Sequence, residues 1–188
     1  MNRRHFPSRS ARLRRSRGAS LVVLVLWTTA LLFGALALAK SIVTSAQVQK
    51  TNEETALACE AATRQIETLK AGVYSEVFVR FNAVTSDDPG MGASPGRSFV
   101  VPGLQAVNGD ADGQAGEIVF PVSLLNGARL SETASGFPGF PRDLNLDGDA
   151  ADASLTTSRI LPVIVRIQWR SSGGGTRTSE IATTLGEP

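Results

Sequence analysis

An uncharged apolar run directly behind a basic segment constrains this chain more than any other feature. Residues 19–39, ASLVVLVLWTTALLFGALALA, form a stretch of 21 residues without a charge, and RLRRSRG precedes them. A helix of that length spans roughly 30 Å, which is enough to cross the hydrocarbon core of a bilayer. The first 18 residues carry seven arginines and no acid, and such positive charge stays in the cytoplasm. We therefore expect a membrane-spanning helix over residues 19–40, with residues 41–188 on the other side.

The positive charge of the chain belongs to this leader. Lys and Arg number 19 and Asp and Glu 17, so that without the seven leader arginines 12 basic residues stand against 17 acidic ones, a net charge near −5. Basic character indicates nucleic-acid binding only where it forms a patch on a folded surface, and the sequence after Lys40 has no such cluster. No nucleic-acid partner is predicted.

Three kinds of processing are compatible with this N-terminus. A secretory signal would be cut after Ala39, because ALA at residues 37–39 is a small-residue cleavage site, although the apolar region exceeds the usual length of roughly 7–15 residues. A signal anchor would keep Met1. A leader cut on the cytoplasmic side of the apolar run would be removed after Gly18, which makes Ala19 the first residue.

The third possibility rests on a family resemblance. A basic leader that ends in Gly18, followed by ASLVVLVL, resembles the class III signal of type IV pilins and type II secretion pseudopilins. In that family a prepilin peptidase cuts after the glycine and the new N-terminus is methylated, which implies cleavage between Gly18 and Ala19. Two positions depart from the family: the usual Phe or Met is Ala19, and the usual fifth-position Glu is Val23. Lack of this Glu is typical of some minor subunits, notably one at the filament tip.

Residues 41–84 are expected to continue the helix as an amphipathic segment. Residues 41–82 contain no Pro, and their single Gly is Gly72. The charged side chains, Glu53 and Glu54 among them, are expected largely away from the apolar face. Apolar residues recur at spacings of three or four and so share one helical face: Ala58, Ala62, Ile66, Leu69, Val73 and Val77. One long helix, lipid-bound in its first half and amphipathic in its second, is the architecture that the resemblance implies.

After residue 84 the composition indicates a loop-rich β region that belongs to the same domain. Residues 85–96, TSDDPGMGASPG, are a loop by their Pro, Gly, Ser and Asp content. Candidate strands are 97–101 and 117–125, with 128–131 pairing back across Asn126-Gly127. Residues 160–170 alternate with period two towards their end, SSGGG follows as a turn, and 176–185 is a returning strand. The predicted fold class is α+β, a long N-terminal helix packed on an antiparallel β-sheet, as in pilins.

An acidic loop is the only part of the sequence that suggests metal chemistry. In DLNLDGDAAD, residues 143–152, oxygen-bearing side chains alternate around a glycine as in the first half of an EF-hand calcium loop. Ser154 stands where a bidentate Glu would close that loop, and Asp152 is the candidate substitute. A weaker repeat, NGDADG at residues 108–113, precedes Glu117. The alternative interpretation is turn formation by Asp, Asn and Gly. The predicted Ca²⁺ ligands are Asp143, Asn145, Asp147, Asp149 and Asp152.

The remaining reactive residue types do not form a catalytic pattern. His5 is the only histidine and lies in the leader, so that no histidine-based catalysis or zinc site is available after it. Cys59 is the only cysteine, which excludes an intramolecular disulfide, and it is expected to be a small packed residue. There is no G-x-S-x-G motif. The chain is therefore expected not to be an enzyme.

The resemblance implies a minor pilin or pseudopilin, a structural subunit of a type IV pilus or type II secretion pseudopilus at low copy number or at the tip. The implied partners are other pilin or pseudopilin subunits, an inner-membrane assembly platform and the prepilin peptidase. The implied location is the inner membrane, crossed once, with the soluble domain in the periplasm or in an extracellular filament. The alternative function is a single-pass, membrane-anchored, extracytoplasmic binding module with calcium-stabilised loops.

Overall fold

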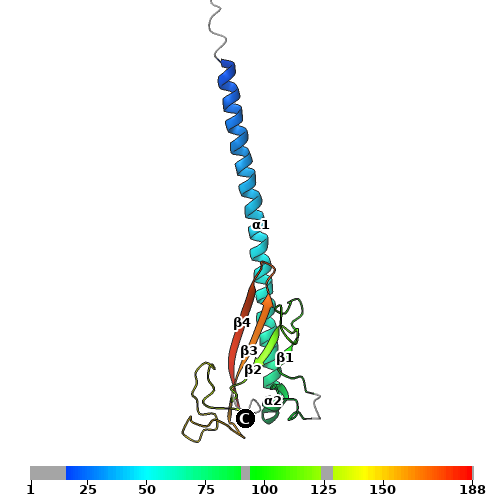
Figure 1. Cartoon of the computed structure of the whole chain (residues 1–188), viewed down its shortest axis with the longest axis vertical. Coiled ribbons are helices and arrows are strands. Elements are labelled where there is room, and N and C mark those ends of the chain that lie inside the picture. Colours follow the sequence, from blue (N-terminus) through cyan, green and yellow to red (C-terminus); the bar gives the residue numbers. More distant parts are fainter. Residues whose placement is uncertain (1–15, 90–93, 124–128, 188) are drawn as a thin grey trace, which may run out of the picture. The chain divides into compact units, whose positions relative to one another are not determined.

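The computed structural model describes residues 16–89, 94–123 and 129–187, with the side chains from residue 20 onward. Its elements are α1 (Ser16–Ala71), α2 (Tyr74–Phe81), β1 (Ser98–Phe99), β2 (Gly116–Val119), β3 (Ile160–Arg170) and β4 (Thr176–Gly186) (Figure 1). The chain divides into two compact units, one ending at Val48 and one beginning at Gln49, and α1 contributes to both. The long N-terminal helix and the sheet confirm the predicted α+β class.

The prediction of one unbroken helix over residues 41–84 is wrong at its C-terminal end. α1 ends at Ala71, and α2 begins at Tyr74 after two connecting residues. Val73 has extended backbone angles, φ −71° and ψ 119°, and its side chain is 64% exposed instead of buried. Gly72 explains the interruption, because glycine is a poor helix former and the N–H of Gly72 closes the last turn on the Leu69 carbonyl at 3.3 Å. The other five members of the predicted apolar face are buried: Ala58, Ala62, Ile66, Leu69 and Val77.

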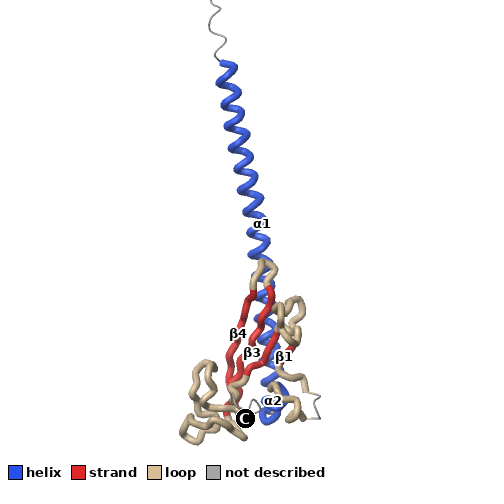
Figure 2. The backbone as a smooth tube through the Cα atoms, in the orientation of Figure 1, coloured by secondary structure: helices blue, strands red, loops and turns tan. Residues whose placement is uncertain are grey.

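The sheet has the order β1-β2-β3-β4, and all neighbouring strands are antiparallel. β3 and β4 pair without a bulge from Ile160 opposite Gly186 to Arg170 opposite Thr176. Alternate residues of β3 form the centre of the core with the buried face of α1, each at most 2% exposed: Leu161, Val163, Val165, Ile167 and Trp169. The alternation predicted for the end of this segment is confirmed from Val165 to Arg170, whereas residues 161–165 are all buried. Figure 2 shows β3 and β4 running beside the C-terminal part of α1.

The first two strands are shorter than the sequence indicates. β1 covers two residues of the predicted 97–101, and β2 ends at Val119, before Pro121. Proline cannot donate to a ladder, which limits regular pairing at this point. The predicted back-pairing of 128–131 is present as an isolated bridge between Val122 and Leu130, and the N–H of Ser131 donates to the Pro121 carbonyl at 2.8 Å. The predicted Asn126-Gly127 turn lies outside the described residues.

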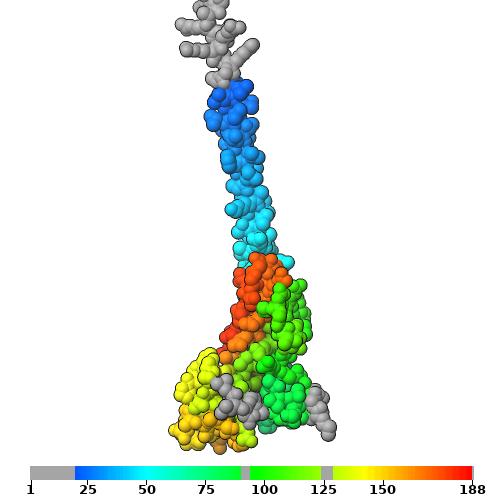
Figure 3. Space-filling view, in the orientation of Figure 1, coloured from blue at the N-terminus to red at the C-terminus, as the bar shows by residue number. Residues whose placement is uncertain are grey.

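A long irregular segment between Leu130 and β3 forms the end of the unit away from the β3–β4 turn (yellow in Figure 3). An isolated bridge joins Leu130 to Leu155, and Leu144 is fully buried. The carbonyl of Leu144 accepts the N–H groups of Arg159 and Ile160 at 2.8 and 3.0 Å. These contacts connect the acidic loop to the start of β3 and thereby to the core.

Candidate functional site

The apolar part of α1 presents its side chains to the outside. Its large apolar residues up to Val48 are 49–72% exposed in the described structure: Leu21, Val22, Val23, Leu24, Val25, Leu26, Trp27, Leu31, Leu32, Phe33, Leu36, Leu38, Ile42, Val43 and Val48. A helix that is apolar on all sides needs lipid or protein around it. By length and composition this helix is able to cross a membrane, a property that signal sequences near an N-terminus share.

The predicted processing positions lie at the start of α1. Gly18 and Ala19 are both within the helix, and Val23 follows one turn later with a side chain that is 52% exposed. An apolar side chain is therefore accessible at the position where the resembling family carries a carboxylate. Cleavage after Gly18 stays a prediction.

A small-residue face accompanies this apolar surface. A shallow apolar groove of about 450 Å³ is lined by Trp27, Ala30, Leu31, Gly34, Ala35 and Leu38. A Cβ atom added at Gly34 would meet no heavy atom within 4 Å outside its own helix turn. Small residues let a second helix approach closely in a membrane, so this face is suited to helix–helix packing.

The five predicted calcium ligands lie in one loop, and most of their oxygens bind the loop's own backbone. Asp143 accepts hydrogen bonds from the N–H groups of Leu146 and Gly148 at 2.6 and 3.0 Å. Asn145, Asp147 and Asp149 each accept the N–H two residues further on, at 3.0–3.1 Å. These are successive Asx turns, in which a side-chain oxygen replaces a backbone acceptor.

The amide of Asn145 lies between two of the carboxylates. Its Nδ2 donates to Asp147 Oδ2 and to Asp152 Oδ2, both at 3.0 Å. Across the described residues, no three His, Cys, Asp or Glu side chains converge as metal ligands. Turn formation is thus sufficient to explain the alternation of Asp and Asn, and calcium binding stays a prediction.

One residue of this loop has a strained backbone conformation that a side-chain hydrogen bond stabilises. Leu146 has φ 64°, in the left-handed region that L-residues other than Asn and Asp rarely enter, and Gly148 has φ 103°. A left-handed leucine costs on the order of 1 kcal/mol. The hydrogen bond from the Leu146 N–H to Asp143 offsets this cost, since it is charge-assisted.

A buried glutamate outside the predicted set anchors the acidic loop. Glu132 has no exposed surface; its Oε1 accepts the N–H groups of Leu144 at 2.7 Å and Asn145 at 3.4 Å, and its Oε2 accepts that of Asp152 at 3.3 Å. Its own N–H donates to the Asp152 carbonyl at 2.9 Å. Both ends of the loop are therefore tied to one residue. The local sequence SET gives no signal for this role.

The anchored loop concentrates negative charge. Burial is the first cause that raises the pKa of Asp152 above its ordinary value, and repulsion from Glu132, Asp147 and Asp149 adds to it. Neighbouring carboxylates that oppose one another's ionisation favour a cation nearby. The charge of the loop is therefore compatible with Ca²⁺, although the described side-chain oxygens are directed to the backbone.

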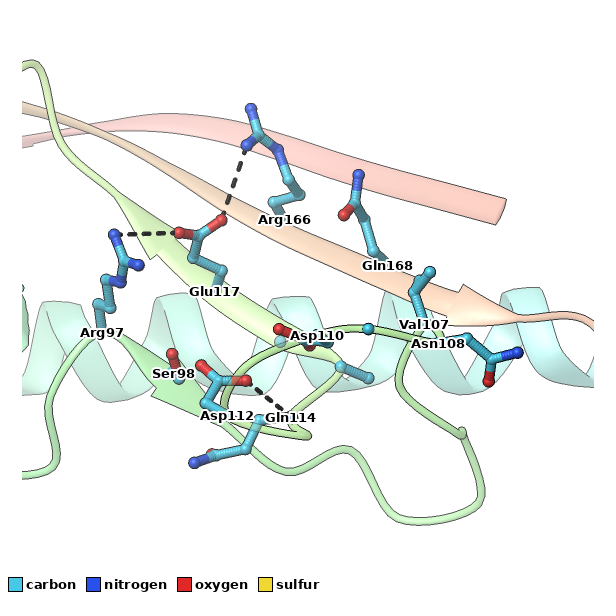
Figure 4. A pocket seen from close by; sticks show the side chains of 13 residues that line it. Arg97, Ser98, Val107, Asn108, Asp110, Asp112, Gln114, Glu117, Arg166 and Gln168 are labelled. Carbon is cyan, nitrogen blue, oxygen red and sulfur yellow. Dashed lines mark hydrogen bonds and ion pairs between the residues drawn. The ribbon is translucent and has the colours of Figure 1, made fainter. Parts of the chain in front are cut away.

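The second acidic segment lines a polar pocket of about 290 Å³ on β1, β2 and β3 (Figure 4). Asp112 accepts the N–H of Gln114 at 2.9 Å, and a hydrogen bond from the Ser98 side chain is the main cause that lowers the pKa of Asp112. Glu117 forms ion pairs with Arg97 at 3.5 Å and Arg166 at 3.6 Å. Glu117 is thus paired with two arginines in the described structure, and a cation site with the aspartates of residues 108–113 stays the weaker prediction.

Glu54, expected away from the apolar face, is instead 8% exposed and holds the β3–β4 turn. Its Oε2 accepts the Trp169 indole N–H at 3.3 Å and the Ser171 hydroxyl at 2.9 Å, and its Oε1 accepts the Ser172 N–H at 2.9 Å. The pKa of Glu54 is lowered to about 2, first by the Ser172 side chain, then by the Ser172 backbone, Ser171 and Trp169, against the opposing effect of burial. A sequence signal existed, because Glu54 lies four residues before Ala58 and extends the apolar stripe.

Cys59, expected to be packed, is exposed. Its Sγ lies 4.0 Å from the Ser179 hydroxyl oxygen of β4. The neighbouring Ala58 occupies the buried face, and the next residue of a helix points about 100° away from it. The prediction failed because the alanines around Cys59 do not all share its side of the helix.

Comparison with protein-family models, curated proteins and solved structures finds no match for this chain.

Proposed function

We propose that this chain is a minor pilin or pseudopilin, a structural subunit of a type IV pilus or type II secretion pseudopilus. The observation that carries the proposal is α1. Its apolar residues are exposed up to Val48, and from Gln49 onward it belongs to a compact unit in which it covers a sheet. Such a helix supplies both a lipid-soluble segment and a domain scaffold without an intervening loop.

The apolar segment would exchange lipid for protein when the subunit enters a filament. Both environments cover apolar side chains, so the exchange removes little hydrophobic stabilisation, and close packing of small residues favours the protein-bound state. The face around Gly34 offers such packing. The partners of this face would be the corresponding helices of other subunits, after extraction by an inner-membrane assembly platform.

Val23 would limit where the subunit is placed. In the resembling family the fifth-position carboxylate neutralises the N-terminal amine of a neighbour, and an unpaired charge in an apolar surrounding is costly. A subunit with Val23 makes no such pair, whereas a terminal position needs fewer helix contacts. The proposal therefore assigns this chain to low copy number or to the filament tip, in the periplasm or outside the cell.

We also propose that the 143–152 loop takes up Ca²⁺, which would neutralise carboxylates that the loop holds around the Asn145 amide. Asp143, Asn145, Asp147, Asp149 and Asp152 would provide the oxygens. Because the side chains of Asn145 and Asp147 are now turned to the backbone and to one another, binding would require them to rotate. The bound ion would stabilise the loop and carry out no chemistry.

The composition of sheared filaments tests the structural role. We expect this chain in trace amounts beside a major subunit that carries Glu at the fifth mature position. The variant Val23→Glu should increase its share, and Val22→Glu, which places the carboxylate one residue away, is the matched control that should not. Recovery of the unaltered chain as the dominant filament protein would contradict the low-copy assignment.

A further inference from the structure

The two edges of the sheet differ in how they are protected. β1, at one edge, has only two residues, whereas β4, at the other, has the full length Thr176–Gly186. β4 pairs with β3 without a bulge and contains no Pro; its charged residues are Arg177 and Glu180. Natural proteins avoid such edges by shortening, bulging or charging them, because an open edge is a template for another strand.

The hydrogen bonds at both ends of the β3–β4 hairpin show which residues of β4 direct their backbone groups away from β3. The N–H of Ser171 donates to the Gly175 carbonyl, and the N–H of Glu187 donates to the Arg159 carbonyl, both at 3.0 Å. In an antiparallel pair of strands, directly opposed residues exchange backbone hydrogen bonds at every second position. Odd-numbered residues of β4 therefore bind β3, and its even-numbered residues direct their N–H and C=O groups outward.

These outward groups are open over most of the strand. The outward residues Thr176, Thr178, Glu180 and Ala182 are exposed, and in the described part of the chain their backbone groups have no hydrogen-bond partner. Towards the C-terminal end, Arg142 Nη1 reaches Thr184 Oγ1 at 3.5 Å, so that the irregular segment approaches the strand there. The free edge is thus the stretch 176–182.

Charge indicates what kind of strand this edge accepts. Glu180 is already paired, since its Oε1 lies 2.6 Å from Arg166 Nε. Arg177 is exposed and has no ion pair among the described residues. For an added antiparallel strand, Arg177 occupies a non-hydrogen-bonded position, where opposed side chains come closest. A matching strand therefore carries an acidic residue opposite Arg177 and no acid opposite Glu180.

A second copy of this chain does not fit through its own β4 edge, and its β1, which runs antiparallel to β4, has only two residues. α1 and β4 run in the same direction, because Glu54 contacts Ser171 before β4, Cys59 lies beside Ser179, and Leu69 lines a pocket with Leu185. If two β4 edges paired antiparallel, the two α1 helices would enter the paired sheets from opposite ends. Two chains anchored in the same membrane enter from the same end.

We propose that the β4 edge is a strand-addition site for an extended, antiparallel segment of a different, neighbouring filament subunit, with an acidic residue opposite Arg177. The identity of the neighbour rests on the proposed function, whereas the open edge and its charge preference do not. Main-chain hydrogen bonds would provide the affinity, and the charge pair the choice of register.

Hydrogen exchange followed at single residues tests the edge in the full chain, held in detergent micelles. Without a ligand, the amides of Thr178, Glu180 and Ala182 should exchange fast and those of Ser179 and Ile181 slowly. The probe is an end-blocked peptide with the sequence of residues 179–186 and the change Leu185→Glu. When the peptide pairs antiparallel with β4 so that Ile181 of the peptide lies opposite Ile181 of β4, the new Glu of the peptide lies opposite Arg177 of β4. In the same register, Ala182 of the peptide lies opposite Glu180 of β4. It should slow the fast amides only.

The matched control peptide carries Leu185→Lys at the same position and should bind roughly three- to tenfold more weakly, which is the range for a cross-strand charge pair made repulsive. Slow exchange of the even-numbered amides in the free chain, no protection by the first peptide, or equal protection by both would overturn the proposal.

A filament experiment tests the neighbour. Ala182→Pro removes an outward donor that β3 does not use, and Ala182→Thr keeps it. The proline variant should be at least about tenfold depleted from sheared filaments at an unchanged melting temperature, and the threonine variant should be retained. Retention of the proline variant at the unaltered level overturns the proposal and leaves the filament function standing. If the unaltered chain enters no filament, both the proposed function and the assignment of a filament subunit as the neighbour are wrong. The peptide experiment then decides separately whether the β4 edge accepts an added strand.

Discussion

Replacing Glu54 tests whether a single carboxylate on α1 holds the β3–β4 turn. In Glu54→Ala, the Trp169 indole, the Ser171 hydroxyl and the Ser172 N–H lose their acceptor. Trp169 and Ser171 are only 2% and 4% exposed, so water replaces the lost acceptor poorly. A hydrogen bond to a charged group contributes about 1.5–3 kcal/mol, and buried donors without a partner cost about 1–3 kcal/mol.

A pocket of about 450 Å³ beside Glu54 admits solvent and reduces these values. We therefore expect Glu54→Ala to lower the free energy of unfolding by about 2–4 kcal/mol. Glu54→Gln keeps the shape and one acceptor oxygen, and should cost about 1–2 kcal/mol. Glu53→Ala, one residue earlier and exposed, is the matched control and should stay within about 0.5 kcal/mol of the unaltered chain.

Urea unfolding of the fragment 49–188, which contains every core residue from Ala58 to Leu185, measures these differences. The dependence on pH gives the second readout. Because folding lowers the pKa of Glu54 from 4.5 to about 2, the carboxylate stabilises the fold above pH 4.5, and this contribution is lost as the pH falls towards 2. The difference between the unaltered fragment and Glu54→Gln should therefore shrink over that interval. Equal stability of the Glu54→Ala and Glu53→Ala fragments, or a difference that does not change with pH, would refute the role of Glu54.

Two further predictions concern the core and the acidic loop. Ile66→Asp buries an unpaired charge and should destabilise the fragment by several kcal/mol, of the order of 3 or more, whereas an unchanged melting temperature would show that the assigned helix face is wrong. Millimolar Ca²⁺ should raise the melting temperature relative to EDTA, with an affinity on the order of 10⁻⁴ M, and Asp147→Ala should abolish the effect while Asp110→Ala preserves it. An identical melting temperature of the unaltered fragment in Ca²⁺ and in EDTA would leave the loop as a set of Asx turns.

The parts of the fold that the sequence predicts well are those with a local periodic pattern of apolar residues. The spacing of Ala58, Ala62 and Ile66 and the alternation from Val163 to Trp169 each identify one buried face, and the structure buries them against each other. The break before α2 was less visible in the sequence, because Gly72 is tolerated within helices, and it is the extended backbone of Val73 that shows it in the structure.

The two buried glutamates show where sequence patterns are insufficient. Glu132 binds backbone groups 12 to 20 residues away, and Glu54 binds partners more than 110 residues away. Hydrogen bonds of this range depend on the assembled fold. In the acidic loop the structure places the five predicted residues together, but alternating Asp and Asn is the pattern of both a calcium loop and a row of Asx turns, so composition alone does not separate the two.

The mass of the mature chain isolated from cells tests the filament-subunit account most directly. The account predicts a chain that begins at Ala19, lighter than the full sequence by the 18 leader residues and heavier by one methyl group at its N-terminus if the family's methylation applies. Gly18→Glu, or loss of the prepilin peptidase, should leave the leader in place. A chain that keeps Met1 in unaltered cells would indicate a permanent membrane anchor, and one that begins at Lys40 a secreted protein; either result would contradict the account.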